Sequence, residues 1–367
     1  MAEGEPLESL QSAVYVVPTE SPEADGTLSW DKTTVVTVTA TAGGVTGTGW
    51  TYSASGAQAV INDVLAGVAV GRSMADVAAL NEDMYRAVRN FGARGIAATA
   101  ISAVDIALWD LQARLAGLSV TELLGEPASV PIYGSGGFTS YDARQLSDQL
   151  AGWVHGQHIP RVKIKIGEAW GTNESRDLER TELARSVIGP DAELYVDANG
   201  AYTAPQAARL AGQLAAAGVS WFEEPVSSDD LGGLAAVRAQ VAPDVAAGEY
   251  SWSLADSAAL LRAGAVDCLQ LDVTRCGGVT GFLRAARLAE ADGLQVSGHC
   301  APNLHARVAA GVTNLRHVEY FHDHQRLEDM LFDGALRPDG GVLTPDSHRP
   351  GFGLELRLPD ADRYRVA

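Results

Sequence analysis

The chain has 367 residues, of which 46% are hydrophobic and 20% charged, and its 27 basic and 46 acidic side chains give a formal net charge of −19. This balance is typical of a globular protein and excludes a disordered one. Such an acidic surface repels phosphate backbones and anionic lipid heads, and no apolar run is expected to approach the length needed to span a bilayer. We therefore expect neither nucleic-acid nor membrane partners.

The N-terminal segment and the cysteines bear on the compartment. Residues 1–11, "MAEGEPLESLQ", have neither the basic nor the apolar region of a secretory signal. Cys268, Cys276 and Cys300 are odd in number and lack CxxC spacing. This pattern is typical of free thiols in a reducing environment. We therefore expect a cytoplasmic protein.

Residues 1 to about 128 indicate an α+β unit. Residues 33–52, "TTVVTVTATAGGVTGTGWTY", alternate, turn at two glycines and alternate again, which predicts a β-hairpin. The glycines of this segment do not form a dinucleotide-binding fingerprint, because no helix follows directly. From about 57 to 124 the apolar residues follow a helical period, with Gly117 as a stop signal.

From about residue 130, short apolar strands alternate with amphipathic helices. Strands alternating with helices predict parallel pairing, and eight strands are the number that closes a (β/α)8 barrel. We therefore predict an α/β fold, with a TIM-type (β/α)8 barrel over residues 129–328 and an irregular Pro-, Gly- and Asp-rich tail over 329–367. The expected strands are 131–136, 162–167, 194–199, 220–225, 245–250, 268–273, 294–299 and 317–321.

Ionisable side chains stand near the ends of these strands, where barrel enzymes collect their chemistry. One such residue alone is more often a solvated or ion-paired loop residue. Seven consecutive strands that end in this way indicate an active site. In strand order the groups are Lys163 and Lys165, Asp197, Glu223 with Glu224, Glu249, Asp272, His299 and Glu319.

Three acidic ends on adjacent strands, Asp197, Glu223 and Glu249, predict a metal site. Carboxylates this close repel one another, and a hard divalent cation relieves the repulsion. Ligation by oxygen alone favours Mg²⁺ or Mn²⁺ over zinc. The alternative is pairing with basic side chains, but few arginines flank these strands. Glu223 and Glu224 lie on opposite faces of their strand, and spacing does not choose between them.

The stretch "RVKIKIG" (161–167) places Lys163 and Lys165 on one face of a strand. We expect their repulsion to lower the pKa of one ammonium group, which becomes a neutral base. The other lysine stays charged and can hold a carboxylate. The alternative is a pair of surface lysines on an edge strand.

Asp272 and His299 end the next two strands. A neighbouring carboxylate can fix the tautomer of an imidazole and raise its pKa, which makes a general base. The remaining histidines of this region are interpreted as structural. They are His305, His322 and His324.

These motifs resemble the enolase superfamily, and within it the mandelate racemase subgroup, over nearly the whole chain. The matching motifs on the second to eighth strands are "KIK", "VDANG", "WFEEP", "GEY", "LQLDVTRCGGVTG", "SGHC" and "VEY". The resemblance implies that residues 1–128, joined by the tail 329–367, form a capping domain. Its loops, 19–30 and 51–57, would close the mouth of the barrel and select the substrate.

The resemblance also assigns roles. It implies that Mg²⁺ is the cofactor, with Mn²⁺ as a substitute, and that the first glutamate of "WFEEP" is the ligand. Lys165 would be the base on one face of the substrate and His299, oriented by Asp272, the acid or base on the other. The implied ligands are Asp197, Glu223 and Glu249; the implied substrate contacts are Lys163, Glu319 as hydrogen-bond donor to the carboxylate, and Asn199.

The implied reaction is removal of the proton α to a substrate carboxylate, with Mg²⁺, Lys163 and Glu319 stabilising the enediolate. A β-hydroxyl on the substrate would leave, giving an acid-sugar dehydratase, which we favour. Without that hydroxyl the outcome is a racemase or epimerase. A Schiff-base aldolase or a non-catalytic binding barrel are the alternatives from other classes. The resemblance further implies a homo-oligomer, a dimer or an octamer.

Overall fold

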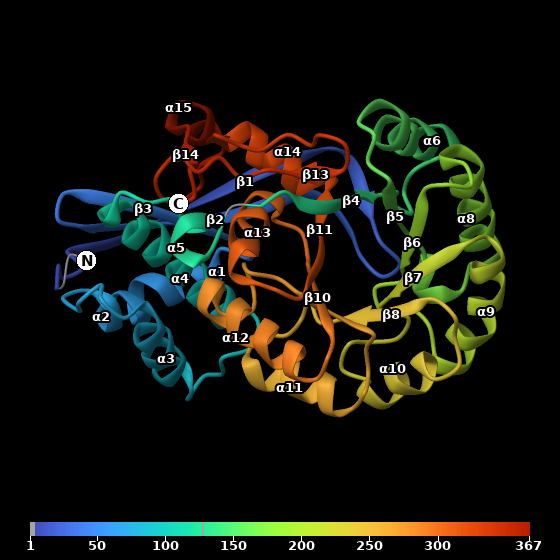
Figure 1. The fold of residues 1–367 in the computed structure, drawn as a ribbon, viewed down its shortest axis with the longest axis horizontal. Coiled ribbons are helices and arrows are strands. Elements are labelled where there is room, and N and C mark those ends of the chain that lie inside the picture. Colours follow the sequence, from blue (N-terminus) through green and yellow to red (C-terminus); the bar gives the residue numbers. More distant parts are fainter. Residues whose placement is uncertain (1–3, 127) are drawn as a thin grey trace.

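In the computed structural model, which describes residues 4–126 and 128–367, a barrel is joined on one side to a smaller α+β cap (Figure 1). Within these residues eight parallel strands close the barrel, because β11 pairs with both β10 and β4. The predicted α/β barrel is confirmed. Its strands are β4 (Val130–Gly136), β5 (Arg161–Lys165), β6 (Glu193–Asp197), β7 (Val219–Glu223), β8 (Asp244–Ala247), β9 (Cys268–Leu271), β10 (Gln295–Gly298) and β11 (Leu315–Phe321).

Amphipathic helices surround the barrel because their apolar residues recur at helical spacing. In α9 (Ala204–Ala216), Ala207, Leu210 and Leu214 are buried, and Thr203 opens the helix with a capping box. The other helices and helical turns of this region are α6 (Ala143–Ala151), η2 (Gly152–Gly156), α7 (Glu168–Gly171), α8 (Glu174–Ile188), α10 (Leu231–Arg238), α11 (Leu254–Arg262), α12 (Gly278–Ala291), α13 (Pro302–Val308), η3 (Ala309–Gly311) and α14 (His322–Leu331).

The cap has an antiparallel sheet packed against helices. Gly43 and Gly44 have φ of 56° and 72°, so they form the tight turn that confirms the predicted hairpin. A Cβ on Gly49 would lie 2.3 Å from a backbone oxygen of the long helix beneath, so glycine permits this close packing. The cap elements are β1 (Ser9–Ala24), β2 (Ser29–Ala42), β3 (Val45–Tyr52), α1 (Gly56–Val60), η1 (Ile61–Leu65), α2 (Ala66–Ala69), α3 (Val77–Val88), α4 (Ile96–Ala116) and α5 (Val120–Leu124).

Helix α4 is apolar on nearly all sides. With 21 residues and a mean hydropathy of 1.3 it is long and apolar enough to cross a bilayer, so the expectation that no run reaches that length is wrong. In the structure 83% of the helix's most apolar 18-residue window is buried, and the helix packs against the cap sheet and α12. The helix is therefore the core helix of the cap. It is apolar on nearly all sides because nearly all sides are buried.

The cap segment 19–30, expected to be a loop, is mostly strand. Residues up to Ala24 belong to β1 and those from Ser29 to β2, and their pairing shifts register between Pro18 and Glu23. The turn rests on the barrel, because Gly26 O accepts a hydrogen bond from Trp170 N at 2.9 Å. The hairpin tip is therefore held over the barrel mouth.

The C-terminal tail returns to the cap, as Figure 1 shows. Val14 N donates to Ala367 O, and Val366 N donates to Val14 O, both at 2.8 Å. The tail is less irregular than expected, because short elements pair with the barrel and with each other. They are β12 (Phe332–Asp333), β13 (Val342–Leu343), which pairs with β4, β14 (Glu355–Leu356), α15 (Leu358–Ala361) and η4 (Asp362–Tyr364).

Candidate active site

The strand ends that face the cap bring the predicted ionisable residues together. Each of these side chains is 5% exposed or less. Parallel strands place their carboxyl ends at one rim, so residues up to 156 positions apart in the chain meet there. Lys163 and Lys165 lie on β5, Asp197 and Glu223 end β6 and β7, Glu249, Asp272 and His299 follow β8, β9 and β10, and Glu319 lies on β11.

The two lysines are paired with carboxylates. Lys165 Nζ lies 2.5 Å from Asp197 Oδ2, and Lys163 Nζ contacts Glu223 and lies 2.7 Å from Glu319 Oε1. Burial lowers the pKa of both ammonium groups, but attraction by these carboxylates outweighs burial and raises both pKa values. The expectation that repulsion depresses one lysine pKa is therefore wrong in this arrangement.

Three carboxylates form the candidate metal centre. Asp197, Glu223 and Glu249 each offer an oxygen, and these oxygens lie within 4.8 Å of one another. Among the described residues, Glu249 Oε2 is buried without a hydrogen-bond partner, although His299 Nε2 lies 3.2 Å away without hydrogen-bond alignment. A hard oxygen donor set with an unpartnered buried oxygen fits Mg²⁺. Glu224 lies outside this group of oxygens, which favours Glu223 as the ligand.

Asp272 holds His299 in one orientation. Its Oδ2 lies 2.8 Å from His299 Nδ1, while its Oδ1 accepts hydrogen bonds from the backbone and hydroxyl of Thr274, both at 2.7 Å. The other ring nitrogen, Nε2, faces the mouth of the barrel. Burial lowers the pKa of His299, but the acidic groups of Cys300 and Glu249 outweigh burial and raise it. The imidazole is therefore poised to carry and give up a proton.

Glu319 is held as an acceptor. Its Oε1 accepts from Ser135 Oγ at 2.6 Å and its Oε2 from Cys300 N at 2.8 Å. Burial raises its pKa, but Lys163 and His299 outweigh burial and lower it. The donor role implied for Glu319 requires a proton, which a substrate carboxylate beside it would favour by raising that pKa.

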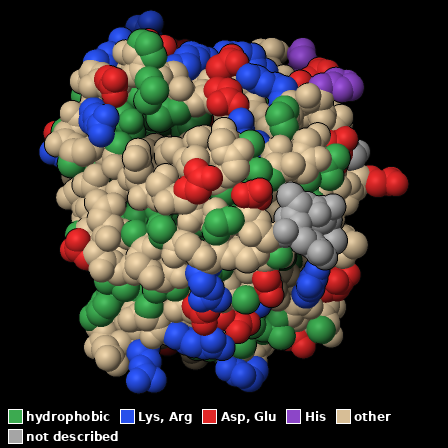
Figure 2. All heavy atoms as spheres, turned by 90° about the vertical axis from the view of Figure 1, so that its left-hand side faces the viewer, with side chains coloured by type: hydrophobic (Ala, Val, Ile, Leu, Met, Phe, Trp, Pro, Cys, Tyr) green, Lys and Arg blue, Asp and Glu red, His purple; other side chains and the backbone are tan. Residues whose placement is uncertain are grey.

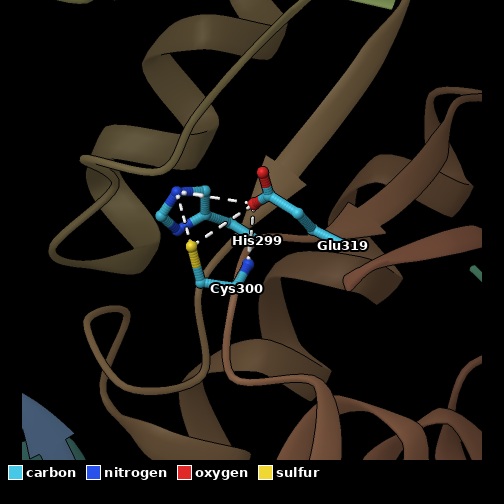
Figure 3. A group of neighbouring side chains, drawn as sticks. All are labelled: His299, Cys300 and Glu319. Carbon is cyan, nitrogen blue, oxygen red and sulfur yellow. Dashed lines mark hydrogen bonds and ion pairs between the residues drawn. The ribbon is translucent and has the colours of Figure 1, made fainter. Parts of the chain in front are cut away.

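Sequence reasoning missed two residues of the mouth. Arg275 lies 3.1 Å from Glu249 Oε1 and 3.3 Å from Asp272 Oδ2, so the argument that few arginines flank these strands overlooked a direct partner. Cys300 Sγ lies 3.3 Å from His299 Nε2 (Figure 3). The signal in the sequence was proximity, because Arg275 lies three residues after Asp272 and Cys300 directly follows His299.

The histidines interpreted as structural have different surroundings. His305 Nε2 accepts from Val273 N at 3.0 Å, and its Nδ1 lies 2.8 Å from Cys300 O, so it ties the end of β9 to that of β10. His324 stacks on Tyr52, with ring centroids 3.4 Å apart, and lines a cavity between the cap and the barrel mouth. His305 is thus a structural tie, whereas His324 forms part of the cavity wall.

A cavity of about 400 Å³ separates the cap from the mouth. Both cap segments expected to close the mouth line it, through Asp25 and Trp30 of the first and Ser53 of the second. On the barrel side the wall includes Lys165, Asn199, Glu249, Arg275, His299 and Cys300. Asn199 Oδ1 is buried and has no hydrogen-bond partner among the described residues, which suits the predicted substrate contact.

The chain matches two family descriptions that together cover most of its length. Residues 12–125 match the mandelate racemase/muconate lactonizing enzyme N-terminal domain, and residues 145–361 match the enolase C-terminal domain-like family. The chain belongs to the enolase superfamily. It is an enzyme of that superfamily, and Mg²⁺ is its cofactor.

Two relatives illustrate the chemistry of the family. The chain is 33% identical over 301 residues to D-galactarolactone cycloisomerase of Agrobacterium fabrum, covering 77% of this chain and 78% of the relative. It is 31% identical over 295 residues to arabinonate dehydratase of Saccharolobus solfataricus, covering 77% of each. Both relatives are named for reactions of sugar acids or their lactones.

Solved structures agree with this placement. A mandelate racemase/muconate lactonizing enzyme-like protein from Rubrobacter xylanophilus is 48% identical, with a TM-score of 0.94 over 98% of this chain and 100% of the other. A racemase from Streptomyces coelicolor A3(2) with bound magnesium is 28% identical, with a TM-score of 0.92 over 98% and 100%.

Proposed function

We propose that the protein is an acid-sugar dehydratase, which removes the proton α to the carboxylate of a polyhydroxy acid and expels the β-hydroxyl. The observation that carries this proposal is the set of polar groups in the cavity wall above two proton-transferring side chains. Asp25, Lys32, Thr33 and Ser53 of the cap line the cavity, beside apolar side chains such as Leu28 and Trp30. Burying a hydroxyl without a partner costs about 1–3 kcal/mol, so such a wall favours a hydroxyl-rich substrate over an apolar one.

Lys165 and His299 reach the cavity from different parts of the barrel rim. They come from β5 and from the end of β10, which are not neighbours in the barrel. A substrate between them has its α-proton beside Lys165 Nζ and its β-hydroxyl beside His299 Nε2. With Mg²⁺ bound, the charge of Asp197 would be offset, which would let Lys165 lose its proton and act as a neutral base. Lys165 then takes the α-proton, and protonated His299 gives its proton to the departing hydroxyl, which leaves as water. Asp272 holds Nδ1 of His299 at 2.8 Å, so that Nε2 is the nitrogen that gives the proton.

Lys163 and Glu319 hold the substrate carboxylate. Their contact at 2.7 Å, with Ser135 behind Glu319, keeps both polar groups in place inside the barrel rim. Asp197, Glu223 and Glu249 would hold Mg²⁺, and Asn199 contacts the substrate. When bound, Mg²⁺ offsets the charge of its three carboxylates and polarises the substrate carboxylate, which acidifies the α-carbon.

The second candidate is a racemase or epimerase. It needs the same two groups, because a proton removed by one can be replaced from the other side by the second. The magnesium-bound racemase from Streptomyces coelicolor, with a TM-score of 0.92, favours it. The cycloisomerase relative points to a further variant, in which the leaving oxygen belongs to the substrate's own ring.

A library of aldonic, uronic and aldaric acids with Mg²⁺, assayed for keto-acid product, tests the proposal. Racemisation of α-hydroxy acids is followed in parallel by optical rotation. Incorporation of solvent deuterium at the α-carbon identifies proton removal even where no product accumulates. Exchange and keto acid with one acid sugar are the expected result. Racemisation without dehydration would favour the second candidate, and no exchange with any acid would contradict both.

Other features of the protein remain predictions. We propose a cytoplasmic homo-oligomer, a dimer or an octamer, organised as a cap (1–128), a barrel (129–328) and a returning tail (329–367). The net charge of −19 supports the absence of nucleic-acid and membrane partners, and acidic and basic side chains lie interspersed on the face of the molecule shown in Figure 2. Light scattering after size-exclusion chromatography measures the oligomeric state.

A further inference from the structure

Three side chains at the ends of β10 and β11 present a nitrogen, a sulfur and an oxygen to one another (Figure 3). His299 Nε2 lies 3.3 Å from Cys300 Sγ and 3.7 Å from Glu319 Oε2, and Cys300 Sγ lies 3.4 Å from Glu319 Oε2. Zinc–ligand bonds of about 2.0–2.3 Å at tetrahedral angles give ligand separations of about 3.3–3.6 Å. The three observed separations are close to the edges of such a tetrahedron.

The backbone turns the thiol towards this point. Cys300 and Ala301 have φ of 52° and 37°, in the left-handed region that residues with a Cβ rarely adopt. The turn is fixed from both sides, because Cys300 N donates to Glu319 and Cys300 O accepts from His305 Nδ1, each at 2.8 Å. The side chain of Cys300 therefore points back to the mouth.

Neighbouring residues orient the three ligand atoms; Glu319 Oε2 also accepts from Cys300 N at 2.8 Å, and His299 Nε2 lies 3.2 Å from Glu249 Oε2. Asp272 holds His299 at Nδ1. A metal-binding imidazole is often oriented in this way, by a carboxylate on the ring nitrogen that does not bind the metal. Ser135 and Lys163 occupy Oε1 of Glu319. A fourth ligand has access from the cavity, because both His299 and Cys300 line it.

We propose that His299, Cys300 and Glu319 form a second metal site, which binds a softer divalent cation such as Zn²⁺. The donor sets separate the two cations, because the oxygen-only set of Asp197, Glu223 and Glu249 suits Mg²⁺ while a mixed nitrogen, sulfur and oxygen set suits Zn²⁺. Binding displaces two protons to solvent, one from the Cys300 thiol and one from Nε2 of protonated His299, so that the sulfur ligates as a thiolate and the ring through the lone pair of Nε2.

Occupation of this site would block turnover. Zinc takes the ring nitrogen and the carboxylate that the dehydration uses, so Zn²⁺ is expected to inhibit the Mg²⁺-loaded enzyme. This consequence rests on the proposed function, whereas the metal site itself rests only on the geometry of the three ligands.

Co²⁺ is the spectroscopic probe for the site, because a thiolate ligand produces a near-ultraviolet charge-transfer band that oxygen ligands do not. The full-length protein, kept reduced and in excess Mg²⁺, is titrated with Co²⁺. We expect the band to saturate at one equivalent, to persist in Cys276→Ser, which alters another buried thiol, and to vanish in Cys300→Ser. The absence of a band in the unsubstituted protein, or an equal band in Cys300→Ser, would overturn the proposal.

A second variant, which keeps the thiol, tests the site even if Cys300→Ser misfolds. Glu319→Gln should retain the band but weaken Co²⁺ binding at least tenfold; unchanged affinity would contradict the site. Added Zn²⁺ should inhibit the Mg²⁺ enzyme, and Cys300→Ser should need at least tenfold more Zn²⁺ for the same inhibition. A cobalt band without zinc inhibition would support the site and contradict the catalytic roles of His299 and Glu319.

Discussion

Two buried carboxylates of the cap, Asp105 and Asp110, and the carboxylates at the barrel mouth have opposite surroundings. In the cap, Asp105 accepts from Asn81 Nδ2 at 2.8 Å and from Thr280 N at 3.0 Å, one bond to each oxygen. Asp110 is likewise satisfied at both oxygens, by Thr48 N, Phe352 N and Arg114 Nε. Each of these two carboxylates is surrounded by donors, and it joins the cap to the barrel or the tail.

At the mouth, by contrast, carboxylates face one another. Asp197, Glu223 and Glu249 lie within reach of a single ion, and lysines fill part of the space between acids. A buried carboxylate whose oxygens all accept hydrogen bonds has a structural role. Carboxylates that share one site and keep an unpartnered oxygen can instead hold a cation and move protons. Changes to the two groups should therefore affect different properties of the protein.

The largest expected effect is on turnover. Lys165→Ala and His299→Asn should each lower kcat about a thousandfold or more, because each removes one of the two proton-transferring groups. Lys165→Arg is the matched control for charge, since it keeps a cation beside Asp197 but cannot act as a base; it should be as inactive as Lys165→Ala. A rate within tenfold of the unsubstituted enzyme would remove that residue from the mechanism. Circular dichroism checks the fold of each variant.

The next effect concerns magnesium. Glu249→Gln should weaken Mg²⁺ binding about a hundredfold in calorimetry, because it removes a charged ligand oxygen. Glu224→Gln is the matched control, because it makes the same change in the adjacent buried glutamate, which lies outside the group of three ligand oxygens. It should change the affinity less than threefold. Equal losses in both variants would place Glu224 among the ligands.

The cap acids should affect stability and not catalysis. Asp110→Ala leaves two buried N–H donors and Arg114 without their acceptor, which should lower the free energy of unfolding by about 3 kcal/mol. Glu355→Ala, which removes the exposed partner of the same arginine, should cost less than about 1 kcal/mol. Urea titrations measure both. A loss of turnover per folded Asp110→Ala molecule at saturating Mg²⁺ and substrate would contradict a purely structural role.

The smallest effect is a pH dependence of the cap. Burial raises the pKa of Asp105 to about 7 from 3.8. Between these two pH values the folded protein binds a proton that the unfolded chain has released. The stabilisation of the folded protein by protonated Asp105 is therefore complete below pH 3.8 and is lost as pH rises through about 7. The slope is about 1.4 kcal/mol per pH unit at its steepest. Asp105→Asn should remove it; equal slopes in both proteins would show that Asp105 titrates normally.

Much of the fold and of the site could be predicted because the signals are local. The barrel strands are apolar runs of four to seven residues, and most predicted site residues lie on a strand or within two residues of its end. Parallel pairing then carries them to one rim, whatever their separation in the chain. The hairpin turn at Gly43 and Gly44 was predictable for the same reason.

What could not be predicted depends on contacts between distant segments. Strand β1 runs through two prolines and two glutamates, and it forms only because β2 pairs with it. Helix α4 resembles a membrane span until the sheet and α12 are seen to cover it.

The sequence alone determined which chemical groups stand at the barrel mouth, since strand periodicity and strand order are properties of the chain itself. Only the tertiary structure decided which atoms meet there. It set the lysine pKa values through Glu223 and Asp197, brought Arg275 to Glu249, and turned Cys300 towards His299. The physical reason is that electrostatic and ligand interactions act over a few ångströms of space, and sequence separation does not report that distance.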